Sequence, residues 1–163
     1  MRTVSLCTFV CLCIASASTG YADDQSEADG WSMSAAMNVM NAQSTLGMLN
    51  LNFPEYGHFK TDPYLTAEKQ AQAAQIEIWL DFTTFAMFSE AGAAVADIAS
   101  AQVEYGDGFV AYNTGEYLAA SSHWGLAFSR ANESVGHAVS AMIARDNGMM
   151  LIEQMYSLYI LQP

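Results

Sequence analysis

Cysteine is scarce in this chain, and all of it lies at one end. The three cysteines, Cys7, Cys11 and Cys13, fall within the first 13 residues of a 163-residue sequence. The other residues therefore offer no thiol that could form a disulfide, ligate a metal or act as a nucleophile. We expect packing, rather than covalent cross-links, to stabilise the fold.

Basic residues are few as well. Five Lys and Arg residues stand against 17 Asp and Glu residues, which gives a formal net charge of −12. No basic cluster with interleaved aromatic residues interrupts this acidic balance, and a field of this sign repels phosphate backbones. The composition argues against nucleic-acid binding and disfavours recruitment to anionic lipid.

The motifs of common hydrolases and the patterns of β-strands are also missing. There is no G-x-S-x-G nucleophile elbow, and no serine has neighbours that would activate it. Glu77 and Asp81 could act as general acids or bases in a cleft, but the face that they share also fits the solvent side of a helix. Nowhere do apolar and polar residues alternate far enough to predict a strand. We expect a non-enzymatic, all-α protein without a cofactor.

The N-terminal segment has the features of a secretory signal peptide. A single cation, Arg2, precedes an apolar run from Val4 to about Ala15, and small residues lead to Ala22. We predict cleavage after Ala22, which removes residues 1–22 and leaves four basic against 17 acidic residues, a net charge of −13. The mature protein is then secreted or periplasmic and has no stable membrane insertion; a retained anchor is the alternative.

The remaining chain divides into a short acidic segment and one helical domain. Residues 23–30 carry acids and no large apolar group, which predicts a disordered lead-in. Residues 31–163 are expected to form a single domain. Within it, Thr66 is a predicted helix N-cap, and the segment Ile76–Phe88 is apolar nearly all round, which is typical of a central buried helix.

Three apolar stripes follow the three- and four-residue steps of helices. The first comprises Met33, Met37, Met40, Ser44, Gly47 and Leu51. The second comprises Val95, Ile98, Gln102, Tyr105, Phe109 and Tyr112. The third comprises Tyr117, Ser121, Trp124, Phe128, Ala131, Val135, Ala138 and Met142. Gly148 is predicted to end that helix, so the pattern indicates an antiparallel bundle of about four long helices plus a short C-terminal helix.

Residues 101–134 resemble a single tetratricopeptide-type helical hairpin. Positions that match the family's pattern are held by Gly108, Ala120, Trp124 and Ala127. The turn "GEY" at 115–117 is also similar to the turn between the two helices of that motif. The chain departs from the pattern at Glu104, Asp107, Ala111 and Asn132. The resemblance implies a protein-interaction scaffold, whereas the alternative is the corner of an ordinary helical hairpin.

The leading functional hypothesis is therefore a protein–protein interaction or scaffold module. The partner is another protein or a second copy of the chain. The candidate binding surface consists of four aromatic residues around the predicted corner, namely Tyr105, Tyr112, Tyr117 and Trp124.

The alternative hypothesis is a helical bundle that binds copper, another transition metal or a small ligand. Glu133 and His137 lie one helical turn apart, a spacing that can ligate a metal from one helix face. Met33, Met37 and Met40 form a thioether face, and soft thioethers suit Cu(I). A charged stripe recurs every seven residues at Glu116, His123, Arg130 and His137. Such a stripe also fits a solvated row of ion pairs that include Glu133, Arg130 and His137.

Overall fold

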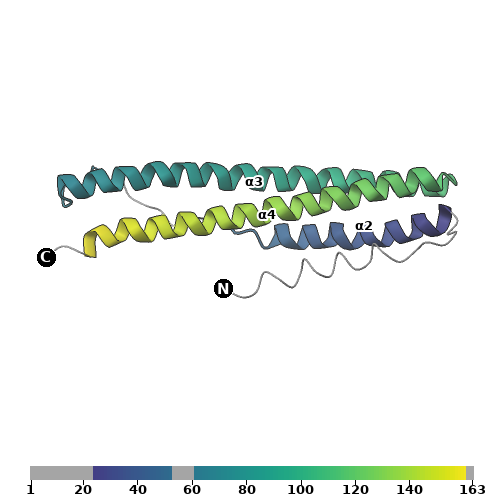
Figure 1. Cartoon of the computed structure of the whole chain (residues 1–163), viewed down its shortest axis with the longest axis horizontal. Coiled ribbons are helices and arrows are strands. Elements are labelled where there is room, and N and C mark those ends of the chain that lie inside the picture. Colours follow the sequence, from purple (N-terminus) through teal and green to yellow (C-terminus); the bar gives the residue numbers. More distant parts are fainter. Residues whose placement is uncertain (1–23, 53–60, 161–163) are drawn as a thin grey trace.

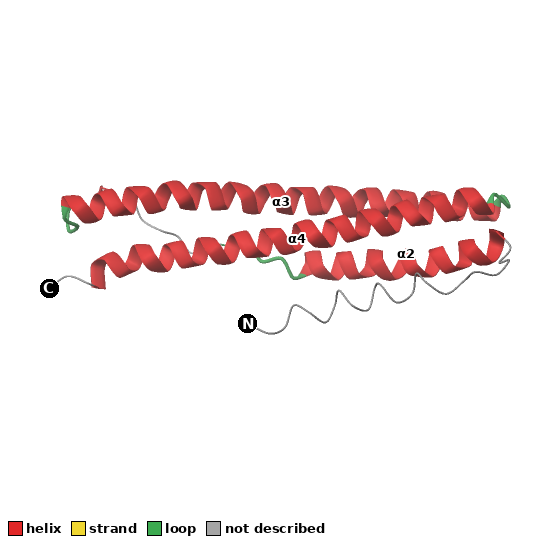
Figure 2. Ribbon diagram, in the orientation of Figure 1, coloured by secondary structure: helices red, strands yellow, loops and turns green. Residues whose placement is uncertain are grey.

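Three helices make up the described part of the molecule, which in this computed structural model comprises residues 24–52 and 61–160. They are α2 (Asp24–Gly47), α3 (Ala67–Asn113) and α4 (Tyr117–Ile160). The described residues contain no strand, so the all-α prediction is confirmed (Figures 1 and 2). In the same part of the chain, none of the helices combines the length and hydropathy of a bilayer-crossing segment. The predicted signal peptide lies outside the described residues.

The two long helices, α3 and α4, form an antiparallel hairpin. Thr66 caps α3, its hydroxyl accepting a hydrogen bond from the Lys69 amide at 3.3 Å, as the sequence predicts. At the other end of α3, Gly115 has a φ of 82°, a conformation that glycine adopts without steric cost. The Glu116 amide then donates to the Ala111 carbonyl over 2.9 Å, which closes the turn and reverses the chain.

Small residues line the seam between α3 and α4. On α3, every seventh residue from Leu80 is buried: Leu80, Met87, Ala94, Ala101 and Gly108. On α4, the corresponding series is Ala120, Ala127, Ser134, Ala141, Gly148 and Met155. The two backbones come close together, because the Ser134 hydroxyl reaches across the seam to donate to the Ala94 carbonyl at 2.7 Å. This seven-residue repeat is that of a coiled coil, with alanine, glycine or serine in most places where larger side chains are usual.

Helix α2 covers only one half of the hairpin. It runs parallel to α4, because Gln25 bonds to Tyr112 near the turn while Asn38 donates to the Phe128 carbonyl further along. Near its end, Leu46 packs against the same buried cluster as Val135 of α4. We call the part beside α2 the corner half (α3 residues 91–113 and α4 residues 117–137). The rest is the distal half (α3 residues 67–90 and α4 residues 138–160), where α3 and α4 extend as a pair (Figure 1).

The number of helices differs from the expectation of about four long helices and a short one. A single helix, α3, spans both the apolar segment 76–88 and the stripe that begins at Val95. Helix α4 continues through Gly148, so the predicted short C-terminal helix is its last turns. Gly148 does not cap the helix but lies buried in the seam, where a small residue allows close packing. Tertiary contacts there offset the low helix propensity of glycine.

The N-terminal turns of α2 correct a second expectation. Residues 24–30, expected to be disordered, are helical. Asp24 and Glu27 lie in the first turn, where acids are stabilised by the helix dipole. Ala28 is fully buried, and Asp29 accepts a hydrogen bond from the Tyr112 hydroxyl at 2.8 Å, so contacts with the hairpin hold this segment.

One of the three predicted stripes faces outward, and a second is only partly buried. On α2 the buried residues are Ala28, Ala35, Val39 and Ala42, while Met33, Met37 and Met40 are 65–70 % exposed. On α3, Val95 and Phe109 are likewise exposed, although Ile98 of the same stripe is buried. The buried residues are mostly alanines, so the larger apolar side chains mark the outer surface. The stripe on α4 is buried or half-buried throughout, which confirms it.

Candidate functional site

Large apolar side chains are exposed together on one stretch of α3. Ile78, Trp79, Phe82, Phe85 and Phe88 have exposed fractions of 50, 57, 65, 74 and 55 %. Trp79 and Phe82 touch, with ring centroids 6.3 Å apart. We call these five residues the aromatic face. They lie in the distal half, beyond the end of α2.

The helical repeat explains why this face is exposed. At 100° per residue, Phe82 points about 140–160° away from the buried seam residues Leu80 and Met87. Since α4 packs on the seam and α2 ends before the distal half, none of the described helices covers the opposite side. The expectation that segment 76–88 is a central buried helix is therefore wrong for the single chain. It has one buried side, formed with Ile152 and Met155 of α4, and one apolar side in contact with solvent.

Helix α4 adds a smaller exposed stripe in the same half. Val139, Ile143 and Met150 are 41, 57 and 53 % exposed. Asp146, which lies between Ile143 and Met150 in sequence, is exposed and puts a charge beside them. The aromatic face is the larger of the two surfaces, and its five members are uncharged.

A row of ion pairs flanks the α3–α4 seam. Acids on α3 recur every seven residues at Glu90, Asp97 and Glu104, and bases on α4 recur at His137, Arg130 and His123. The pairs are His137 Nδ1–Glu90 Oε2 at 2.6 Å, Arg130 Nη1–Asp97 Oδ1 at 3.7 Å and His123 Nδ1–Glu104 Oε2 at 2.7 Å. Matching periods on antiparallel helices keep each base opposite an acid, which favours this register.

The pairing across the helices changes the chemistry of His137. The hydrogen bond from Nδ1 to the Glu90 carboxylate raises the pKa of His137, and the charges of Asp97 and Glu133 act in the same direction. Of the ion pairs that the sequence predicts within α4 itself, one is present: Arg130 bonds to Glu133 at 3.0 Å. His137, however, is held mainly by α3.

The residues predicted to bind a metal are not gathered in one place. Glu133 is paired with Arg130 and His137 with Glu90, whereas Met33, Met37 and Met40 lie on the exposed side of α2. A different group does come together: ligand atoms of Glu104, Asp107 and His123 all lie within 4.8 Å of one another. The sequence signal for this group is that Glu104 and Asp107 lie one helical turn apart. They become a candidate metal site only when the register of α3 against α4 places His123 beside them.

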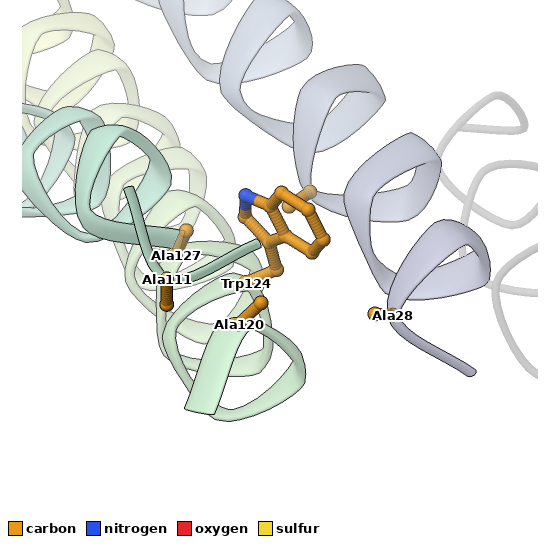
Figure 3. Packing of buried hydrophobic residues seen from close by; sticks show 6 residues of the cluster. Ala28, Ala111, Ala120, Trp124 and Ala127 are labelled. Carbon is orange, nitrogen blue, oxygen red and sulfur yellow. The ribbon is translucent and has the colours of Figure 1, made fainter. Parts of the chain in front are cut away.

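The four aromatic residues predicted to bind a partner pack around the corner. Trp124 is 1 % exposed, and its Nε1 donates to the Tyr105 carbonyl at 3.1 Å. Tyr112 lies against both Trp124 and Tyr117, with ring centroids 5.6 and 5.1 Å apart. Figure 3 shows the indole enclosed by alanines of all three helices. The structure gives these residues a packing role, and their contact with a partner stays a prediction.

Comparison with known proteins does not add to these observations. The chain matches no protein-family model, no curated protein and no solved structure.

Proposed function

We propose that this chain is an exported, non-enzymatic helical protein that acts as a protein–protein interaction or scaffold module, and that the aromatic face is its binding surface. The observation that supports this most is the exposure of five large apolar side chains next to one another on α3. Contiguous exposed apolar surface of this kind marks interaction sites in soluble proteins, and aromatic residues dominate the energetics of interfaces.

The architecture supports a binding role without an enzyme cleft. The α3–α4 seam is filled mostly by small residues, and side-chain pairs link the two helices along the corner half. A rigid helix that presents side chains in fixed steps is a common way to engage a groove or another helix. The export and non-enzymatic parts of the proposal rest on the sequence.

Photo-crosslinking in the producing cell tests the binding role. A photoreactive phenylalanine analogue at Phe85 should form a covalent adduct, because this side chain is 74 % exposed at the centre of the face. The matched control carries the analogue at Val103, which is 63 % exposed on the corner half of the same helix. Equal adduct yields at the two positions, or no adduct at either, would show that the aromatic face is not a binding surface.

A transition-metal site is the second candidate function, and the Glu104–Asp107–His123 group favours it. Its ligand atoms, which lie within 4.8 Å of one another, need to approach by at most about 1.4 Å to reach the roughly 3.4 Å separation around a tetrahedral Zn²⁺. Metal that binds the folded state should raise the melting temperature of the purified chain. The rise should disappear in His123→Gln and persist in His137→Gln, because the His137–Glu90 pair has Ala93 at the position equivalent to Asp107. No shift with Zn²⁺, Cu²⁺ or Ni²⁺ would dismiss this candidate.

A further inference from the structure

The structure also indicates what covers the aromatic face. We propose that two copies of this chain associate through it, packing α3 against α3 as a symmetric antiparallel dimer. This inference rests on the proposed function, because it names the partner of the same surface. The reasons are the area of the face, its spacing and the apolar character of its five members.

The exposed area is close to what one side of a stable dimer requires. The five side chains are 50–74 % exposed, which at roughly 200 Å² for a large side chain amounts to about 600 Å². The largest apolar patch on an ordinary monomer is about 300–600 Å², and a stable interface buries about 800 Å² per partner. Around the face, the exposed Gln75, Ala86 and Ser89 are uncharged and can supply the remainder.

The spacing of the face suits a second copy of the same helix. Ile78, Phe82 and Phe85 are separated by four and three residues, the repeat by which helices pack in coiled coils. When two such helices lie antiparallel, Phe82 meets its own counterpart at the two-fold axis and Ile78 meets Phe85 of the other copy. The surface is therefore self-complementary, as a symmetric interface requires.

Burial by a second copy also explains the composition of α3. A helix that is apolar all round is ordinarily buried on all sides. In the dimer, this stretch of α3 lies between its own α4 and α3 of the other chain. In the corner half, the rows of Ile78 and Phe82 continue with Ala96, Ala99 and Gly106 and with the exposed Val103 and Val110, and they carry no aromatic residue.

Charge distinguishes a second copy from a basic protein partner. Each chain carries a net charge of −12, so two copies repel at long range. The five members of the face are apolar, and the exposed Asp81 lies between Phe85 and Phe88 on the same side of the helix. Salt screens that repulsion, and the dimer should therefore tighten as ionic strength rises. A basic partner would instead bind more weakly in salt.

Sedimentation equilibrium of the purified chain tests the inference, over concentrations from about 1 to 100 μM. We expect the mass of two chains at the upper end, and a dissociation constant that falls when salt is added. Phe82→Glu should weaken association at least about 100-fold, because it places a charge at the two-fold axis. The control Val103→Glu has the same charge change and a similar exposed fraction (63 % against 65 %), three heptads further along, and should leave the constant unchanged.

The outcomes separate this inference from the proposed function. A monomer at all concentrations, or equal effects of the two glutamate variants, would overturn the dimer. If the photo-crosslinker at Phe85 then forms an adduct with a different protein, the binding role stands and only the choice of partner fails. If it forms none, both fail. Circular dichroism shows that each variant remains helical, and Phe85→Glu, at a 74 % exposed position, serves as a second test if Phe82→Glu unfolds.

Discussion

Replacing Gly108 with alanine measures how closely α3 and α4 approach in the corner half. A Cβ at this position would lie 2.4 Å from Trp124 Nε1 and 2.5 Å from Trp124 Cδ1. The indole would have to move by about 1 Å to restore ordinary contact, but it is 1 % exposed and bonded to the Tyr105 carbonyl. Overpacking costs about 1–3 kcal/mol and the weakened hydrogen bond about 1 kcal/mol. Alanine's higher helix propensity returns at most about 1 kcal/mol.

The expected net effect of Gly108→Ala is a loss of about 1–3 kcal/mol in the free energy of unfolding. The control is Gly106→Ala, two residues away on the same helix, where an added Cβ meets nothing within 4 Å. That change should stabilise the protein by about 0.5–1 kcal/mol through helix propensity alone. Urea unfolding followed by circular dichroism gives both values. If the two substitutions shift stability in the same direction and by the same amount, the close helix approach that we describe is wrong.

Three further predictions concern single contacts. His137→Gln should lower the melting temperature more at pH about 5.5 than at pH about 8.5. The pKa of His137 is raised beside Glu90, so its contribution to stability is complete below the ordinary pKa of about 6.5 and is lost as pH rises through the raised pKa. Equal losses of melting temperature at the two pH values would contradict this. The Tyr159 hydroxyl donates to the Asp62 carboxylate, which raises the pKa of Tyr159 to about 12; in an absorbance titration Asp62→Asn should return that group to about 10, and no change would refute the contact. Ser134→Ala removes a hydrogen bond but leaves the seam filled, so urea unfolding should show a loss of only about 0.5–1.5 kcal/mol; a loss above about 3 kcal/mol would refute this account of the seam.

The parts of the fold that periodicity predicts are those in which large side chains are buried. Helix α4 lies between α3 and α2, so its buried side is broad and includes Trp124, Phe128 and Val135. Its pattern therefore identifies the correct face. The cap at Thr66 and the turn at Gly115 were also accessible from the sequence, because each depends on the chemistry of one residue.

The parts that periodicity misassigns are those in which alanine is buried. On α2, Ala28, Ala35 and Ala42 pack on the hairpin, while the methionines between them lie outside. Hydrophobicity alone ranks methionine above alanine, but two backbones that come close together have room only for small side chains. The choice between the two stripes depends on the distance between helices, which the sequence does not specify.

Candidate sites built from several helices were beyond the sequence for a related reason. The charged stripe on α4 was visible, yet its partners Glu90 and Glu104 become neighbours of His137 and His123 only through the antiparallel register. The aromatic face was visible as well, but as a stretch expected to be buried. The sequence shows that this stretch of α3 is apolar nearly all round. The expected burial of its outer side is not found in the single chain.

The two halves of α3 use equivalent positions differently, and this contrast carries the strongest argument for a partner. Seven-residue repeats place Ile78 and Phe85 on the same outer row as Gly92, Ala99 and Gly106. If solvent met the whole outer side of the helix, the bulk of this row would have no reason to change at the end of α2. On this row, large side chains occur in the distal half, and the exposed Gly92, Ala99 and Gly106 occur in the corner half. Larger exposed side chains of the corner half, Val95, Val103, Phe109 and Val110, lie on other rows of α3. Five large apolar side chains gathered on the uncovered distal half of α3 are best explained by contact with another chain.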